Sequence, residues 1–429
     1  MRSRFLIPLL LNLILVSPAF SSSPLIRIGI LLKQSQVRIG ASGEFKIIEA
    51  KNNKLLAEGS LKDCWLIQPN NLGLKIGEKG IGSEEIIILS SNSSTLLVNQ
   101  RPYRGKIEIR KNNQGSLTVI NELNIEEYLY GIMKMEISPS WPEEAQMSQA
   151  VVARTYALSN LGKYQSQGFD LTSTDKDQVY AGVYGEDPRS NQAVDKTYGQ
   201  VLTFEGELAK TFYHADSGGW TEDIQNVWGE SIPYLKSVSS PALDSPHQKW
   251  RLEFKAKDFR EILRKNGLKV GKIYQILPLK ITPAGRIMLL KIEHSEGELK
   301  VSASKLRSIL GTSKLKSTLF KINLSGERTE EITSFLSSEN IVLFNKEGEK
   351  EVTLNRIVLL SAREKVKGGD KVSALTIVKI PATIKFSGKG WGHGVGMSQW
   401  GAKGLAEQGY TYQQILEHYY PGTRLKRWY

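Results

Sequence analysis

Short apolar runs separated by turn residues dominate the first part of the chain. The runs 26–31, 44–48, 85–89 and 105–110 are rich in isoleucine, and asparagine, glycine and serine turns separate them. Short runs of β-branched residues bounded by such turns are typical of strands. The pattern therefore predicts a β-rich region over residues 22–116.

A helical spacing of apolar residues follows and ends at a carboxylate. The apolar face of residues 125–135 is made by Ile125, Leu129 and Ile132. The next position on that face is Glu136. A buried carboxylate is costly unless it is partnered or functional, and burial would raise its pKa and favour general-acid catalysis. A structural glutamate satisfied by backbone donors or by an arginine explains the same position.

A second predicted helix carries an arginine among its apolar residues. It begins at the capping box 140–143, which has proline in its first turn, and continues to about residue 161. Arg154 interrupts its apolar face, which consists of Met147, Ala150, Val151, Leu158 and Leu161. An ion pair between Glu136 and Arg154 would explain both residues. Alternatively, Arg154 holds a sugar or a carboxylate while Glu136 stays partly unpaired.

The rest of the chain returns mainly to short strands. Helices are expected near residues 256–266 and 303–310, and a last helix begins at the capping box 411–414. The predicted fold class is α+β, with a mixed β-rich core and a few helices. The predicted parts are a signal peptide (1–21), an N-terminal β-rich accessory region (22–116), a core in two pieces (117–243 and 383–429) and an inserted β-rich unit (244–382).

The N-terminus has the composition of an export signal. Met-Arg-Ser-Arg precedes the apolar residues 5–16, and small residues suited to cleavage after Ser21 follow. The apolar run is too short to favour a stable membrane span, with an uncleaved anchor as the alternative, and no other segment is expected to cross a bilayer. We therefore expect export to the periplasm, the cell wall or the extracellular space. Cys64 is the only cysteine, which excludes an internal disulfide and a multi-cysteine metal site.

The chain is basic, with a formal net charge of +13 from 57 Lys and Arg against 44 Asp and Glu. A local basic cluster lies at residues 424–427. In an exported protein, a polyanionic or carboxylate-bearing envelope polymer is a better partner than nucleic acid, although charge alone does not decide this.

Glycine occupies every second position from Gly388 to Gly396, with His393 among them. Alternate residues of an extended segment share one face, so this face would carry no side chains and another backbone or a flat ligand could approach it. The opposite face would carry Lys389, Trp391, His393, Val395 and Met397. The spacing differs from the Rossmann fingerprint, and the chain contains no P-loop. A tight packing site without chemistry is the alternative.

Other candidate residues lie in the segments 212–219 and 397–400. His214, Asp216 and His393 lack the short spacing of a metal site, and no serine-hydrolase elbow surrounds Ser217. A packed, hydrogen-bonded histidine is the commoner outcome for any one of these. The aromatic residues Tyr410, Tyr412, Tyr419 and Tyr420 suit sugar stacking, and they equally suit an ordinary core.

Taken together, these segments resemble the SpoIID/LytB family. The matching pieces are residues 121–136, 146–157, 178–182, 212–221, 234–238 and 390–402. The resemblance covers roughly residues 117–429 and is interrupted by a less distinctive β unit. It leaves the N-terminal β region out.

The resemblance implies peptidoglycan chemistry. Sporulation members of the family are lytic transglycosylases that act on peptide-stripped glycan strands, and their catalytic glutamate falls on Glu136. One carboxyl group would protonate the MurNAc–GlcNAc oxygen and then accept a proton from the attacking C6 hydroxyl, which yields a 1,6-anhydro product. This differs from two-carboxylate hydrolysis. LytB members are instead described as enhancers of a separate amidase, so a non-catalytic glycan-binding role is the alternative.

The sequence departs from the family pattern at two places. Some members bind zinc with two cysteines before the Gln-Val-Tyr motif, and the corresponding positions here are Leu171 and Asp177. We therefore expect no structural zinc and no cofactor. Residues 135–139 read Met-Glu-Ile-Ser-Pro where relatives often have Glu-Met-Pro. This keeps the acid and changes the turn after it.

The predicted site combines one catalytic residue with a set of substrate contacts. Glu136 is the predicted acid. The expected substrate-binding residues are Arg154, Tyr156, His214, Ser217, Trp391, His393, Ser398 and Gln399, and no metal ligand is expected. On this interpretation the glycine segment is one wall of a glycan groove, and its acid comes from the helix that ends at Glu136.

Overall fold

The computed structural model describes residues 23–91, 94–242, 244–326, 328–336, 357–366 and 369–429. The predicted signal peptide, residues 1–21, lies outside the described residues. The chain forms two compact units, each described by itself below. The first contains Met1–Pro139, Ala153–Leu202 and Leu425–Tyr429, and the second contains Ser140–Val152 and Thr203–Arg424.

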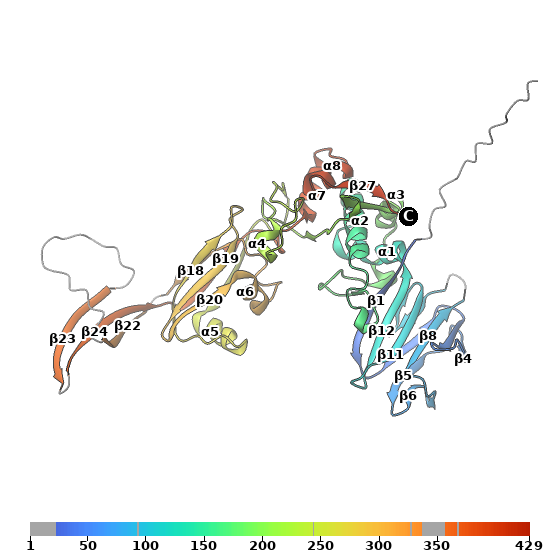
Figure 1. Ribbon diagram of the computed structural model, residues 1–429, viewed down its shortest axis with the longest axis horizontal. Helices are drawn as coiled ribbons and strands as arrows, with labels where there is room; N and C mark the ends of the chain where they lie inside the picture. Colours follow the sequence, from blue (N-terminus) through green and yellow to red (C-terminus); the bar gives the residue numbers. More distant parts are fainter. Residues whose placement is uncertain (1–22, 92–93, 243, 327, 337–356, 367–368) are drawn as a thin grey trace, which may run out of the picture. The chain divides into compact units, whose positions relative to one another are not determined.

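Two antiparallel-rich sheets form the β part of the first unit. The larger has the order β13-β1-β12-β11-β8-β3-β4, and Figure 1 shows β1, β12, β11 and β8 side by side. Its strands are β1 Leu25–Gln34, β3 Phe45–Glu49, β4 Leu55–Gly59, β8 Glu85–Ser90, β11 Lys106–Lys111, β12 Leu117–Asn124 and β13 Leu171–Thr172. The alternating isoleucines explain this sheet, because Ile26, Ile28, Ile107 and Ile109 are fully buried.

The smaller sheet has the order β10-β9-β2-β5-β6-β7. Its strands are β2 Val37–Ala41, β5 Trp65–Asn70, β6 Gly73–Ile76, β7 Lys79–Gly80, β9 Leu96–Val98 and β10 Arg101–Tyr103. The helices and turns of the unit are α1 Ile125–Glu136, the 3-10 turns η1 Gln165–Gln167 and η2 Gly182–Gly185, and α3 Pro188–Lys196. The helix α2, Glu143–Ser159, contributes to both units, since the division falls inside it.

Four small sheets make the β part of the second unit. In one, β25 (Thr383–Gly388) pairs with both β17 (Trp250–Lys255) and β21 (Phe320–Ser325). Two others are β18-β19-β20 (Ile273–Ile281, Ile287–His294, Gly297–Ser302) and β22-β24-β23 (Arg328–Leu336, Gly369–Ile380, Ile357–Val366). In the fourth, β16 (Tyr213–His214) runs parallel to β26 (Met397–Ser398). A further sheet has the order β15-β14-β27 (Glu207–Leu208, Gln200–Phe204, Arg424–Arg427).

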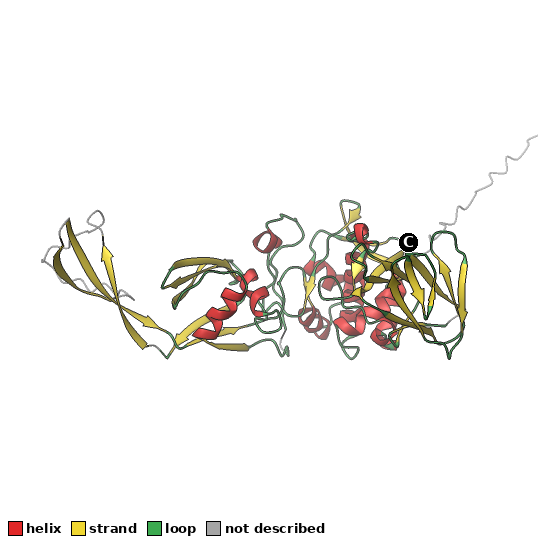
Figure 2. Cartoon of the chain, turned by 90° about the horizontal axis from the view of Figure 1, so that it is seen from below, coloured by secondary structure: helices red, strands yellow, loops and turns green. Residues whose placement is uncertain are grey.

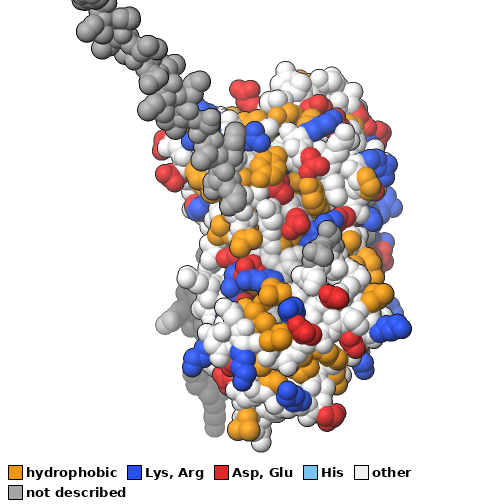
Figure 3. Space-filling model, turned by 90° about the vertical axis from the view of Figure 1, so that its right-hand side faces the viewer, with side chains coloured by type: hydrophobic (Ala, Val, Ile, Leu, Met, Phe, Trp, Pro, Cys, Tyr) orange, Lys and Arg blue, Asp and Glu red, His pale blue; other side chains and the backbone are white. Residues whose placement is uncertain are grey.

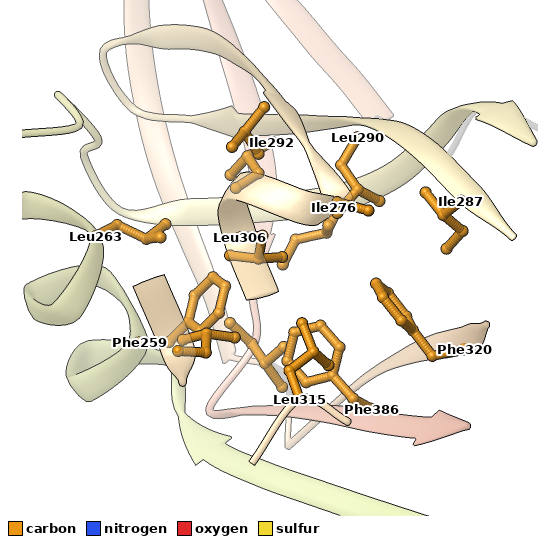
Figure 4. Packing of buried hydrophobic residues seen from close by; sticks show 14 of the residues in the cluster. Phe259, Leu263, Ile276, Ile287, Leu290, Ile292, Leu306, Leu315, Phe320 and Phe386 are labelled. Atoms are coloured by element: carbon orange, nitrogen blue, oxygen red, sulfur yellow. The ribbon is translucent and has the colours of Figure 1, made fainter. Parts of the chain in front are cut away.

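The helices of the second unit are α4 Ile224–Trp228, α5 Ala256–Lys265, α6 Ala303–Leu310, α7 Gln399–Glu407 and α8 Tyr412–Tyr419. The capping box predicted for the last helix is confirmed, because the Thr411 side chain accepts from Gln414 N–H while the Gln414 side chain accepts from Thr411 N–H. A hydrophobic core joins α5 and α6 to the neighbouring sheets through Phe259, Leu306, Phe320 and Phe386 (Figure 4).

The predicted α+β class is confirmed, and Figure 2 shows both helices and strands in the chain. The predicted domain boundaries stay predictions. None of the helices in the described part of the chain has the length and apolar content that crossing a bilayer requires. On the face shown in Figure 3, basic and acidic side chains are interspersed, so the net positive charge does not gather there into one patch.

Candidate functional site

In the first unit, the predicted acid is the last residue of α1. Asn124 caps the helix by accepting a hydrogen bond from Glu126 N–H at 2.8 Å. The predicted apolar face is confirmed, because Ile125, Leu129 and Ile132 are fully buried. Glu136 itself is half-buried and accepts a hydrogen bond from Val179 N–H at 3.2 Å. The carboxyl group is thus held by the backbone and still reaches the surface.

The segment that holds Glu136 is anchored on both sides of Val179. The Gln178 side chain accepts from the Tyr128 hydroxyl at 3.0 Å and donates to the Ala153 carbonyl at 3.4 Å. The Tyr180 hydroxyl donates to Asn121 at 2.7 Å. These contacts give the Gln-Val-Tyr motif a physical role, since its two side chains fix the backbone whose N–H contacts the carboxylate.

The charge of Glu136 reaches a buried tyrosine. Burial, and after it the negative charges of Glu136 and Asp177, raise the pKa of Tyr128 well above its ordinary value. The Tyr128 hydroxyl therefore stays protonated and serves as a hydrogen-bond donor to Gln178.

Arg154 pairs with a different glutamate from the one expected. Its Nε and Nη2 donate to the two Glu126 oxygens at 2.9 and 2.7 Å, which corrects the predicted Glu136–Arg154 pair. The remaining donors reach the Gln200 carbonyl at 3.1 Å and the Val194 carbonyl at 3.2 Å. Arg154 is fully buried. Because all its side-chain nitrogens are bonded within the protein, it offers no donor to a ligand.

Tyr156 and Asp177 belong to a polar cluster that closes the loop after β13. The Asp177 carboxylate accepts from Thr172 N–H at 2.9 Å, from Thr172 Oγ1 at 2.7 Å and from Lys163 at 2.5 Å. Burial alone would raise the pKa of Asp177, but the hydrogen bonds from Lys163 and Thr172 outweigh it and lower the pKa. Burial, and then the charge of Asp177, raise the pKa of Tyr156 to about 12. Leu171 is fully buried, and the Asp177 carboxylate is bonded to Thr172. The two positions at which some family members have zinc-binding cysteines therefore both contact the protein interior.

In the second unit, the glycine segment is not the extended strand that alternation predicts. The strand β25 ends at Gly388. Positive φ angles of 74°, 122°, 90° and 70° occur at Gly390, Gly392, Gly394 and Gly396. Residues that carry a side chain rarely adopt this left-handed region of φ, so the backbone conformation itself requires glycine. The prediction of one bare face and one side-chain face is therefore wrong after Gly388.

The glycine positions are covered by the protein itself. A side chain added at any of these glycines would meet atoms of a neighbouring residue. For Gly388, Gly390, Gly392, Gly394 and Gly396 these are, in that order, the Trp250 ring, the Asp216 carbonyl, the His214 Cβ, the Arg286 guanidinium and the Phe212 carbonyl. These close approaches fill the side of each glycine on which a side chain would stand. The segment serves as a packing surface that lets large groups approach its backbone.

We expect Gly394→Ala to lower the free energy of unfolding by about 2–4 kcal/mol, as measured by denaturant unfolding. Strain at positive φ costs roughly 1–2 kcal/mol, and overpacking against Arg286 adds about 1–3 kcal/mol. The matched control is Gly409→Ala, because Gly409 has a φ of 89° against 90° at Gly394 but nothing within 4 Å of the added methyl. Equal losses in the two variants would contradict the packing role of Gly394.

Two neutral imidazoles lie beside this segment. His214 Nδ1 donates to the Val395 carbonyl at 3.1 Å, and Val395 N–H donates to His393 Nδ1 at 3.1 Å. Burial lowers the pKa of His214 well below its usual range and, with the charges of Arg307 and Arg286, lowers the pKa of His393 to about 3. Both rings are therefore uncharged at neutral pH.

The other predicted contacts in this unit have internal partners. Ser398 caps α7 by accepting from Gly401 N–H, and it also accepts from Ser217 N–H at 3.2 Å. The Gln399 side chain is buried and lies 3.5 Å from that of Gln149. Trp391 is half-buried, with the Lys316 ammonium 5.1 Å from its ring centre.

The predicted residues thus fall into two groups. Glu136, Arg154 and Tyr156 belong to the first unit, and the predicted contacts from His214 to Gln399 belong to the second. The prediction that they share one groove stays a prediction.

Comparison with known proteins gives two family matches. The family described as Stage II sporulation protein matches residues 113–204, and a domain of unknown function (DUF8618) matches residues 242–337. The chain is 30% identical over 306 residues to the amidase enhancer of Bacillus subtilis, which covers 69% of this chain and 40% of that protein. It is 26% identical over 320 residues to the stage II sporulation protein D of Bacillus amyloliquefaciens, with 71% and 74% covered.

The chain belongs to the SpoIID/LytB family. A third relative is an uncharacterized protein of Brachyspira hyodysenteriae, 28% identical over 409 residues, with 94% of each chain covered. In this SpoIID/LytB protein, Glu136 and its partner Val179 both lie in the segment 113–204 that matches the sporulation family.

Sequence reasoning missed two arginines of this SpoIID/LytB protein. Arg286 and Arg307 both lie in the matched segment 242–337. Arg286 is almost fully buried and packs on Gly394, while Arg307 is half-buried on α6. No pattern sets either arginine apart from the other basic residues of the chain, so only their burial singles them out.

Proposed function

We propose that this protein is an exported lytic transglycosylase that cleaves the MurNAc–GlcNAc bonds of peptide-stripped peptidoglycan strands. Membership of the SpoIID/LytB family supports a cell-wall-related role. The observation that carries the finer proposal is the position of Glu136 at the end of α1, half-buried and bonded to Val179 N–H within the sporulation-family segment. The predicted leader supports export.

One carboxyl group performs both proton transfers in this scheme. Protonated Glu136 donates to the glycosidic oxygen, and the bond from MurNAc C1 to that oxygen breaks. The MurNAc C6 hydroxyl then attacks C1 and gives its proton to the Glu136 carboxylate, which restores the acid. No water is consumed, and the products are a free GlcNAc end and a 1,6-anhydro sugar.

Two features around Glu136 suit its two states. It is the last residue of α1, where the negative end of the helix dipole disfavours a carboxylate charge and favours the protonated acid. The Val179 N–H stabilises the negative charge after the proton has left. Neither feature requires a second carboxylate.

A second candidate function is enhancement of a separate amidase. The observation that favours it is the 30% identity to a protein named amidase enhancer. In this case the chain binds glycan strands or the amidase and performs no cleavage.

The experiment is incubation of the purified chain with peptide-stripped glycans and, separately, with intact peptidoglycan. We expect 1,6-anhydro products, detected by mass spectrometry, from the stripped strands. A chain that yields no such product but increases the rate of a cell-wall amidase would overturn the transglycosylase proposal in favour of the enhancer.

A further inference from the structure

A cavity in the second unit contains an arginine with unused donors. Its volume is about 420 Å³, and its lining includes Glu222, Trp228, Arg286, Arg307 and His393. Such a volume lies within the range of sites that bind small molecules, roughly 300–1,000 Å³. The lining comes from α4, from the start of β19, from α6 and from the glycine segment.

Arg286 is the unusual residue of this cavity. Only 1% of its surface is exposed. Its Nη2 donates to the Ser217 carbonyl at 2.6 Å, whereas Nε and Nη1 have no hydrogen-bond partner among the described residues. Burial lowers its pKa to about 10, against the attraction of Glu222, so the group is still charged at neutral pH. A buried cation with two unused donors is costly unless a ligand supplies acceptors.

The acid in the same lining does not satisfy Arg286. One oxygen of Glu222 accepts from Asp223 N–H at 3.0 Å and from the Asn226 amide at 2.8 Å. The other accepts from the Thr282 hydroxyl at 2.6 Å. Glu222 therefore offsets the charge of Arg286 at a distance, and Nε and Nη1 of Arg286 keep no acceptor among the described residues.

A second guanidinium lines the same cavity. Arg307 Nε donates to the carbonyls of Leu315 and Lys316 at 3.0 and 3.1 Å, which fixes its direction. No hydrogen bond occupies its terminal nitrogens among the residues that the structure describes. Trp228 and His393 form an aromatic wall, with ring centres 5.1 Å apart. The cavity thus combines planar cationic forks with a surface on which a ring can stack.

We propose that this cavity binds a sugar acid through its carboxylate, which the Arg286 and Arg307 guanidiniums hold while the sugar ring lies on Trp228 and His393. Guanidinium forks match the two oxygens of a carboxylate. The choice of N-acetylmuramic acid, whose lactyl carboxylate is free in peptide-stripped strands, rests on the proposed function. The carboxylate site itself rests only on the arginines.

The charges of the lining favour a monoanion. Two arginines and Glu222 sum to one positive charge, because His393 is neutral. Asp216, whose charge also acts on Arg286, lies outside the lining and accepts from Gly218 N–H and the Ser245 hydroxyl. A carboxylate balances this arrangement, whereas a phosphate dianion would leave excess negative charge in a buried place.

The test is titration calorimetry of the full chain with N-acetylmuramic acid. N-acetylglucosamine is the matched sugar without the carboxylate, and we expect it to bind at least tenfold more weakly, as we do inorganic phosphate. Arg307→Gln should weaken binding of N-acetylmuramic acid by about tenfold or more, because a charge-assisted hydrogen-bond pair is lost. The control is Arg264→Gln on the exposed side of α5, which should leave binding unchanged.

Arg286→Gln should weaken binding of the sugar acid more, but it also removes a buried side chain that packs on the glycine segment. Arg307→Gln is therefore the decisive variant, because Arg307 is only half-buried. Equal binding of the two sugars, stronger binding of phosphate, or binding unaffected by Arg307→Gln would overturn the proposal. Glycan cleavage without binding of the sugar acid would contradict this inference alone, and binding without cleavage would contradict the proposed function alone.

Discussion

Glu136→Gln is expected to lower the rate of 1,6-anhydro product formation from peptide-stripped glycans by about 10²- to 10⁴-fold, the usual contribution of a general acid–base group. Glutamine keeps the shape of the side chain and can still accept a hydrogen bond from Val179 N–H. It can neither donate the proton that the leaving oxygen needs nor accept one from the C6 hydroxyl. Initial rates by mass spectrometry measure the loss.

The matched control is Glu127→Gln, which removes a carboxyl group from the same helix and leaves unchanged the C-terminal end at which Glu136 lies. Glu127 lies in the first turn of α1. Circular dichroism of both variants checks that the fold is kept. Wild-type activity in Glu136→Gln would remove Glu136 from the mechanism, and an equal loss in Glu127→Gln would show that the effect is not specific to the end of the helix.

Arg154→Leu is expected to lower the free energy of unfolding by about 3–5 kcal/mol, because it leaves the buried Glu126 without its cation. The pair is bidentate, and Arg154 is fully buried. Glu126 also accepts from Gly199 N–H at 3.1 Å and from the Tyr429 hydroxyl. Removing Arg154 therefore also weakens the packing of the C-terminal residues against Glu126. Chemical denaturation, followed by circular dichroism, measures the change.

Two comparisons make this result specific. Arg189→Leu removes an arginine from an exposed ion pair with Asp187 and should leave stability unchanged within error. The double variant Arg154→Leu, Glu126→Leu should be more stable than Arg154→Leu alone, since no uncompensated charge remains buried. A single variant as stable as wild type would contradict the structural role of the Arg154–Glu126 pair.

Local patterns in the sequence predict local structure well in this protein. The apolar spacing before Glu136 predicts a helix over residues 125–135, and α1 spans Ile125–Glu136. The expected helix at 303–310 corresponds to α6, Ala303–Leu310. The capping box at Thr411 begins α8 as predicted. In each case the signal and its effect lie within a few residues, so the local pattern is enough to place the helix.

Pairing between distant residues could not be predicted in the same way. The sequence marks Glu136 and Arg154 as two charges on apolar faces, but the partner of Arg154 is Glu126. Glu126 follows the cap of α1, where an acidic residue is ordinary, so nothing signals its burial. Which of two glutamates meets an arginine depends on how α1 and α2 pack, which periodicity does not contain.

By itself, the sequence determined the α+β class, the helices around the candidate acid and the family to which the chain belongs, because short-range patterns and ordered motifs encode all three. Only the tertiary structure decided what the glycines are for. Their alternation predicts an open face, yet positive φ angles turn the backbone, and the atoms that fill the space include the guanidinium of Arg286. That arginine lies more than one hundred residues earlier in the chain, and its unused donors follow from burial, a property of the packed fold rather than of residue order.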